Sequence, residues 1–240
     1  MSDSGEVEHR PPHHHRDVRG GAARAAVFGV SDGLVTNVSL VLGVAGASPG
    51  GSIVRLAGVA GLIAGSFSMA AGEYVSMQAQ RELWQREIEV ERRALSHHPE
   101  GEAAELRAMY VERGIDPDVA TDMANAVMRD PELALEVHAR EELGISTESL
   151  GSPWQAAAAS FGTFALGALI PLLPWLFTSG TAALVLSIAC SAVAAVVVGV
   201  VLSRFTERSP LFSAVRQLGV TAVAAAVTYA VGRAVGSGVS

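Results

Sequence analysis

Lysine is absent from this chain of 240 residues, and all 17 of its basic residues are arginines. Together with abundant alanine, glycine and valine, this composition indicates the coding bias of a GC-rich, bacterial genome. It does not indicate nucleic-acid binding, because the net charge is −7 and the arginines form no basic stripe. We therefore expect no nucleic-acid partner.

Other scarcities narrow the class of protein further. The chain has one cysteine, Cys190, which excludes disulfide frameworks and cysteine zinc sites. Aromatic residues make up 5% of the chain, too few for the aromatic-lined pocket expected of a transporter for small organic solutes. Charged residues make up 17%, against about 25% in ordinary soluble domains. Since half of the residues are apolar, the composition favours a membrane protein.

Charge is distributed unevenly, and the gaps in it locate the membrane spans. Residues 25–80 contain only Asp32, Arg55 and Glu73 as charged residues, and residues 153–201 contain none. The second interval alone is long enough for two crossings of about 20 residues each. The sequence thus predicts an all-α integral membrane protein with five transmembrane helices. We place them at residues 25–47, 52–77, 153–177, 181–203 and 211–231.

Between spans two and three lies an insert that is rich in charge and acidic overall. The predicted divisions are a disordered cytosolic tail at 1–24, spans one and two at 25–80, a cytosolic helical metal-binding domain at 81–150, and spans three to five at 151–240. Asp-Pro starts and glycine ends predict insert helices at 81–96, 99–113, 116–129 and 130–144. The tail has no apolar core and is therefore not a signal peptide.

Arginine placement predicts the orientation of the chain. Arginines cluster before span one, after span two and before span five, and with five spans these regions share one side of the membrane. The opposite side has only Arg55 and Arg233. The positive-inside rule therefore puts the N-terminus and the insert in the cytoplasm and the C-terminus outside. The composition favours a bacterial plasma membrane over an organelle.

Two carboxylates within the spans are the first candidate functional residues, because a charge at mid-span costs about 2.5–3.5 kcal/mol. Asp32 lies in span one, and Glu73 ends a stripe in span two that contains Gly61, Gly65 and Met69 at every fourth position. The glycines permit close helix approach. A carboxylate beside a thioether suits a borderline metal such as Fe(II) or Mn(II). The alternative is that Met69 is apolar packing and Glu73 lies at the cytoplasmic interface.

The insert contains the second set of candidates. Glu102, Glu105, Met109 and Glu112 fall on one helix face at steps of three or four, and His138 forms a similar set with Glu141 or Glu142. Converging carboxylates predict a cation site, to which histidine and methionine add a preference for transition metals. A solvated acidic face is the alternative. The tract His13-His14-His15 is only a weak metal signal on the tail.

Longer motifs resemble the vacuolar iron transporter family. These are VFGVSDGLV at 27–35 with NVSLVLGV at 37–44, GSFSMAAGEYVS at 65–76, and the insert ending in HAREELG at 138–144. The resemblance covers about residues 20–235. It implies a five-span homodimer that moves Fe(II), and often Mn(II), out of the cytosol in exchange for protons. Lipid, protons and divalent metal ions would be its partners.

The resemblance also implies roles for single residues. Asp32 and Met69 match the family's intramembrane metal ligands, and Glu73 matches a carboxylate that lines the pathway. The family's cytosolic glutamates map onto Glu91, Glu102, Glu105 and Glu142. One position departs from the family, because Ala94 stands where a second glutamate is expected.

Two other classes of function compete with the transporter interpretation. A di-iron oxidase would use Glu-x-x-His pairs, and the insert contains none. A membrane-anchored sensor or buffer that binds metal without moving it remains an alternative. We expect a transporter and not an enzyme, with no prosthetic group and with Fe(II) or Mn(II) bound as the transported ion.

Overall fold

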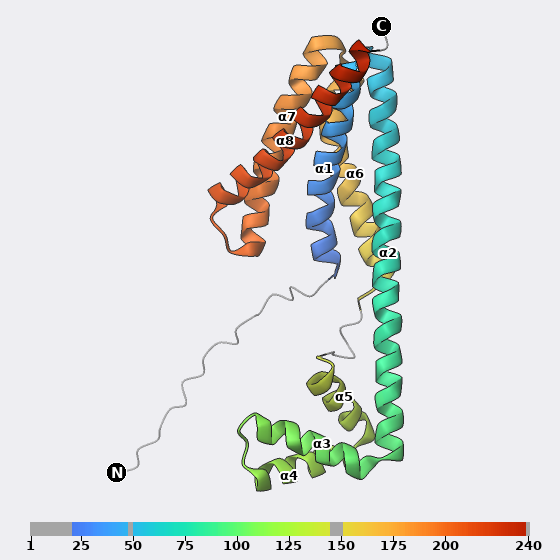
Figure 1. Ribbon diagram of the computed structural model, residues 1–240, viewed down its shortest axis with the longest axis vertical. Coiled ribbons are helices and arrows are strands. Elements are labelled where there is room, and N and C mark those ends of the chain that lie inside the picture. The colour runs from blue at the N-terminus through green and yellow to red at the C-terminus, as the bar shows by residue number, and fades with distance from the viewer. Residues whose placement is uncertain (1–20, 48–49, 145–150, 239–240) are drawn as a thin grey trace, which may run out of the picture.

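A computed structural model describes residues 21–47, 50–144 and 151–238, and Figure 1 shows their arrangement. Within these ranges the chain forms eight helices and no strands. They are α1 (Gly21–Ala47), α2 (Gly51–His97), α3 (Pro99–Glu112), α4 (Pro117–Val127), α5 (Pro131–Glu142), α6 (Pro153–Phe177), α7 (Gly180–Thr206) and α8 (Pro210–Ser237). Five helices, α1, α2, α6, α7 and α8, are long and apolar enough to cross a membrane. The predicted all-α membrane class with five spans is confirmed.

Helix α2 is the longest element and joins the two parts of the molecule (Figure 1). Its 47 residues continue without a break from the second span into the insert, because no glycine or proline occurs between Glu73 and His97. The helix ends before Pro99, whose ring disfavours helical geometry at His98. At 1.5 Å per residue, α2 is about 70 Å long.

Helix α1 is central among the apolar helices and packs against α2, α6, α7 and α8. Its contact with α6 is a close one between backbones. A Cβ atom at Gly33 would collide with the carbonyl oxygen of Phe164, and one at Gly167 would collide with that of Val30. Small residues at helix contacts are how membrane helices gain van der Waals packing.

The apolar core of this bundle lies toward the end away from the insert. It consists of Val41, Val54, Leu172, Trp175 and Ala183. Two prolines, Pro171 and Pro174, lie within α6, which stays helical to Phe177. Ser187 of α7 donates a hydrogen bond of 2.7 Å to the carbonyl oxygen of Pro171, which ties α7 to α6 beside these prolines.

The helix bounds differ from the predicted spans by a few residues. Helix α1 begins at Gly21, four positions before the predicted start, and α8 continues to Ser237 rather than ending at Val231. The tail at 1–20, with its histidine tract, lies outside the described residues, as do Ser48 and Pro49 between α1 and α2.

Helices α3, α4 and α5 pack around the end of α2 that lies away from the apolar bundle (Figure 1). Their starts follow the predicted caps. The Asp116 side chain accepts from the backbone N–H of Asp118, and that of Asp130 accepts from Glu132 and Leu133. Positive φ values of 88° at Gly114 and 64° at Gly144 suit glycine after a helix end. A small core joins α3 to α4 and consists of Leu106, Tyr110, Ala120 and Ala124.

Candidate functional site

Four side chains from three helices converge in the insert. Glu91 comes from α2, Glu102 from α3, and His138 and Glu142 from α5. Each offers one ligand atom, and these atoms all lie within 4.8 Å of one another. His138 is at the centre, with its Nδ1 3.0 Å from Oε1 of Glu142, 3.2 Å from Oε1 of Glu91 and 3.7 Å from Oε2 of Glu102. We call this set the insert quartet.

The insert quartet is buried at one end and open at the other. Side-chain exposure rises from 0% at His138 through 10% at Glu91 and 14% at Glu102 to 23% at Glu142. An ion would therefore enter past Glu142 and Glu102 and meet Glu91 and His138 last.

Hydrogen bonding within the insert quartet is incomplete. A ring nitrogen carries at most one proton, and Nδ1 of His138 is hydrogen-bonded to Glu142. Because that one proton is shared with Glu142, Oε1 of Glu91 has no hydrogen-bond partner among the described residues. Buried polar atoms in folded proteins nearly always have partners, so Oε1 of Glu91 points to a missing one. Three carboxylates around one imidazole carry excess negative charge, and a divalent cation would both complete the bonding and balance that charge.

The electrostatics of the carboxylates agree with this interpretation. Burial raises the pKa of Glu91, and the nearby charges of Glu142, Glu102 and Glu105 raise it further, against a lowering by His138. Burial is also the main reason why the pKa of Glu102 is raised. Among the described residues, His138 lowers the pKa of both carboxylates and His98 lowers that of Glu102, but neither offsets the effect of burial.

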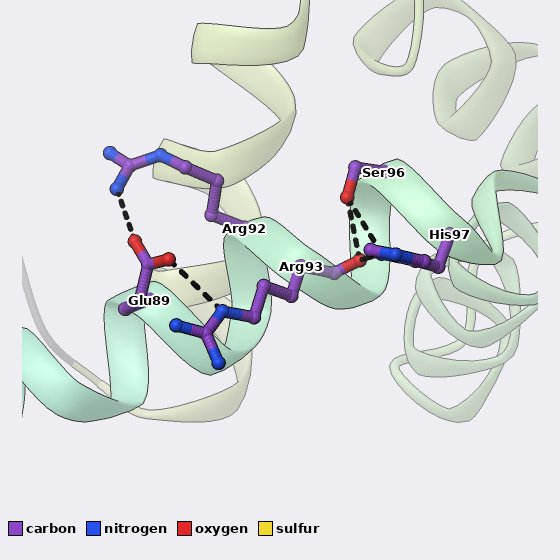
Figure 2. A network of polar contacts seen from close by, with 5 residues as sticks. All are labelled: Glu89, Arg92, Arg93, Ser96 and His97. Carbon is purple, nitrogen blue, oxygen red and sulfur yellow. Dashed lines mark hydrogen bonds and ion pairs between the residues drawn. The ribbon is translucent and has the colours of Figure 1, made fainter.

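Glu89 of α2 shows the contrast (Figure 2). It accepts hydrogen bonds of 3.0 Å from Arg92 and 3.1 Å from Arg93, both on its own helix. These two arginines lower the pKa of Glu89. On the same face, Ser96 and His97 both contact the carbonyl oxygen of Arg93. This surface network satisfies its own charge and leaves no ligand for an ion.

The other candidates in the insert have different neighbours. Glu105 is exposed and lies outside the insert quartet, although its charge raises the pKa of Glu91 and of Glu102. Met109 packs against the small α3–α4 core. Glu141 pairs with Arg113 across the insert. Ala94, at the position of the missing glutamate, brings no ligand atom to the insert quartet.

The intramembrane candidates lie on two helices and are only half-buried. Asp32 of α1 is half-buried and accepts a hydrogen bond of 3.4 Å from Thr36, which is exposed. Met69 and Glu73 of α2 are also half-buried. In the part of the chain that the structure describes, Asp32 and Glu73 belong to no group of three or more His, Cys, Asp or Glu ligand atoms. One chain thus brings together the insert candidates but not the intramembrane ones.

The glycine stripe of α2 lies where close helix approach was predicted. A Cβ atom at Gly61 would collide with Leu40 of α1, and one at Gly65 would collide with the ring of Phe164 of α6. Asn37 of α1 lies beside Gly61 and donates a hydrogen bond of 2.6 Å to the carbonyl oxygen of Ala168. The stripe therefore brings α1, α2 and α6 together just before Met69 and Glu73.

Sequence reasoning missed one polar contact near Asp32. Gln217 of α8 donates a hydrogen bond of 2.8 Å to the hydroxyl of Ser31, the residue before Asp32. The signal in the sequence was a glutamine within an otherwise apolar span, but nothing there identified its partner 186 positions away.

Comparisons with known proteins cover nearly the whole chain. A family model described as VIT family matches residues 23–233. "Vacuolar iron transporter 1" of Oryza sativa subsp. japonica is 32% identical over 93% of this chain and 90% of its own length. "Vacuolar iron transporter 1" of Arabidopsis thaliana is 32% identical over 90% of this chain and 87% of its own length. "Vacuolar iron transporter" of Acanthamoeba castellanii is 41% identical over 64% of this chain and 55% of its own length.

Proposed function

Because this chain belongs to the VIT family, we propose that it moves Fe(II), and also Mn(II), out of the cytosol in exchange for protons. The observation that carries the proposal is the insert quartet, in which three carboxylates and a buried imidazole converge and Oε1 of Glu91 lacks a hydrogen-bond partner. The relatives named as vacuolar iron transporters support metal as the cargo.

The insert quartet is proposed to collect the metal before it enters the membrane. Carboxylate oxygens alone suit Mg²⁺ and Ca²⁺, whereas an imidazole adds affinity for iron and related transition metals. His138 is the buried end of the site, so an ion that enters past Glu142 becomes fully coordinated only when it reaches this nitrogen.

Within the bilayer, Asp32, Met69 and Glu73 are proposed to form the metal path. A second copy of the chain would complete it. The support is that Asp32 is only half-buried and Thr36 beside it is exposed, on a helix that crosses the membrane. A carboxylate facing lipid is costly. On α2, Gly72 next to Glu73 has open space where a side chain would be. A homodimer joined through these faces would cover the carboxylates and bring ligands from two chains together.

Proton exchange follows from competition for the same oxygens. A metal ion binds only to deprotonated carboxylates, so binding releases protons and protonation releases metal. A pH gradient across the membrane would then drive metal in one direction. Arginine placement supports a cytoplasmic N-terminus and insert, with the C-terminus outside, and composition supports a bacterial plasma membrane.

The test is metal flux into sealed proteoliposomes under an imposed pH gradient. Wild type is expected to move Fe(II) or Mn(II), and Asp32→Ala is expected to reduce this flux by about 100-fold or more, while the insert still binds metal. Asp122→Ala is the matched control, because Asp122 is an exposed acid of α4 outside the insert quartet. Metal binding by wild type without any flux would contradict the proposal and indicate a sensor or buffer.

A further inference from the structure

Helix α8 buries a face that is mostly polar. Its buried residues are Ser213, Ala214, Gln217 and Thr221, whereas apolar side chains of the same helix such as Val220 and Val223 are exposed. This is the reverse of a helix in water and suits a span whose apolar side chains face lipid. Polar side chains within a span are costly and usually serve a contact inside the protein.

Gln217 is the member of this face that reaches another helix. Its side chain donates to Oγ of Ser31 at 2.8 Å, and the residue is 8% exposed. By contrast, the hydroxyl of Thr221 donates to the carbonyl oxygen of Gln217 within α8, and that of Ser213 has no partner among the residues described. The bond from Gln217 ends on the residue directly before Asp32.

The far end of the α1–α8 contact is built differently. A Cβ atom at Gly232 would collide with the carbonyl oxygen of Gly43, and one at Gly236 would collide with that of Ala47. The two backbones therefore touch near the C-terminus, whereas toward the insert side α7 and α8 lean away from α1 (Figure 1). Near Asp32, where α1 and α8 diverge, the long side chain of Gln217 connects the two helices. At the other end, their backbones are in direct contact.

We infer that Gln217 is a positioning residue for Asp32. Neighbouring residues project about 100° apart around a helix, so directing Ser31 toward α8 sets the direction in which Asp32 projects. The Asp32 carboxylate is then held on the Thr36 side of α1. The inference rests on the proposed function, because the direction of Asp32 matters to transport only if Asp32 binds the transported ion.

A cysteine reporter at position 32 tests the positioning directly. The background is Cys190→Ala, which removes the one native cysteine, and Asp32→Cys is then labelled with a maleimide in the full-length protein. Loss of an interhelical hydrogen bond in a membrane protein changes an equilibrium constant by a factor of roughly three to ten. Adding Gln217→Leu is expected to change the labelling rate by about that factor. The control is Thr228→Val, since the Thr228 hydroxyl bonds only within α8. Equal rates with and without Gln217→Leu would overturn the inference.

A double variant separates positioning from stability. Replacing both partners, as Ser31→Ala with Gln217→Leu, leaves no unpaired polar group and is close to neutral for folding. We expect it to melt near the parent temperature and still to show the altered labelling rate. A return to the parent rate would show that the bond serves stability only and would overturn the inference.

Flux gives the functional readout. With Asp32 present, Gln217→Leu is expected to lower the maximal Mn(II) flux about threefold to tenfold, with metal binding at the insert quartet unchanged. Flux equal to that of Thr228→Val would count against the inference. If wild type shows no flux, the proposed function fails, and the labelling comparison still decides the role of Gln217.

Discussion

Helix α2 holds acidic residues in opposite ways in its insert part and in its membrane part. At the insert end, Glu91 meets ligands from α3 and α5 of the same chain in a partly buried site. In the membrane part, near the middle of α2, Glu73 is half-buried, as is Asp32 of α1, and neither belongs to such a group within the described chain. The short insert helices α3 and α5 surround Glu91 on several sides. The long spans α1 and α2 instead leave Asp32 and Glu73 half-buried. One chain thus brings the insert quartet together, whereas it groups neither Asp32 nor Glu73 with other such ligand atoms among the described residues.

We expect the largest effect from a double variant that removes the insert quartet alone. Glu91→Ala combined with His138→Ala deletes the two most buried ligands of the insert quartet. We expect the affinity of the insert for Mn(II), measured by titration calorimetry, to fall by at least about 100-fold, since even outer-shell changes cost 10–100-fold. Flux at high metal concentration is expected to persist, because the intramembrane path is untouched. His97→Ala, an exposed histidine outside the quartet, is the control.

A bulky residue at the exposed face of α1 tests whether a second copy covers it. Thr36→Trp is expected to lower flux about tenfold, because overpacking a closed interface costs roughly 1–3 kcal/mol. A lipid-facing position would accept tryptophan. Val193→Trp provides that comparison, since Val193 of α7 is 66% exposed. Native mass spectrometry should show fewer dimers for Thr36→Trp alone, and equal dimer fractions and flux in both variants would argue against the covered face.

The pH dependence of the insert should change sign when metal is added. Because the pKa values of Glu91 and Glu102 are raised above the ordinary 4.5 in the folded protein, the metal-free native state binds more protons than the unfolded state. Its stability should therefore rise as pH falls through the raised pKa values toward 4.5. With saturating Mn(II), stability should instead fall, because protons displace metal. Thermal melting at pH 7.5 and pH 5.5, with chelator or with Mn(II), measures both directions. A metal-free protein that loses stability on acidification contradicts the assignment.

The smallest effect is expected at the Arg113–Glu141 pair. Arg113 is half-exposed, and exposed ion pairs contribute about 0–1 kcal/mol. Arg113→Ala should therefore shift the melting temperature slightly and leave Mn(II) affinity unchanged. A large loss of affinity would instead place Glu141 among the ligands.

Much of the architecture could be predicted from charge alone. The gaps between charged residues located all five spans, and Asp-Pro pairs located the starts of α4 and α5. The reason is physical, because lipid excludes charge strongly and caps act over three residues. Four of the metal candidates in the insert do come together, but Glu105, Met109 and Glu141 had the same helical spacing and lie elsewhere. On short, solvated helices, acidic spacing does not reveal which face turns inward.

Long-range polar contacts could not be predicted in the same way. Ser31 and Gln217 carry no charge, and either could have faced its own helix backbone, as Thr221 does. Only the packing of α8 on α1 decides that they meet.

The unbroken helix α2 fixes the distance between the insert quartet and the carboxylate in the membrane span. Glu73 and Glu91 are 18 positions apart on one helix, which is five turns, so they project from the same side about 27 Å apart. That span exceeds the reach of a screened charge in salt, about 8 Å, so the membrane carboxylates exert almost no pull on an ion at the insert. An ion leaving the insert must therefore diffuse. In the proposed function, α2 thus sets the distance that an ion released from the insert quartet would diffuse before it meets Glu73.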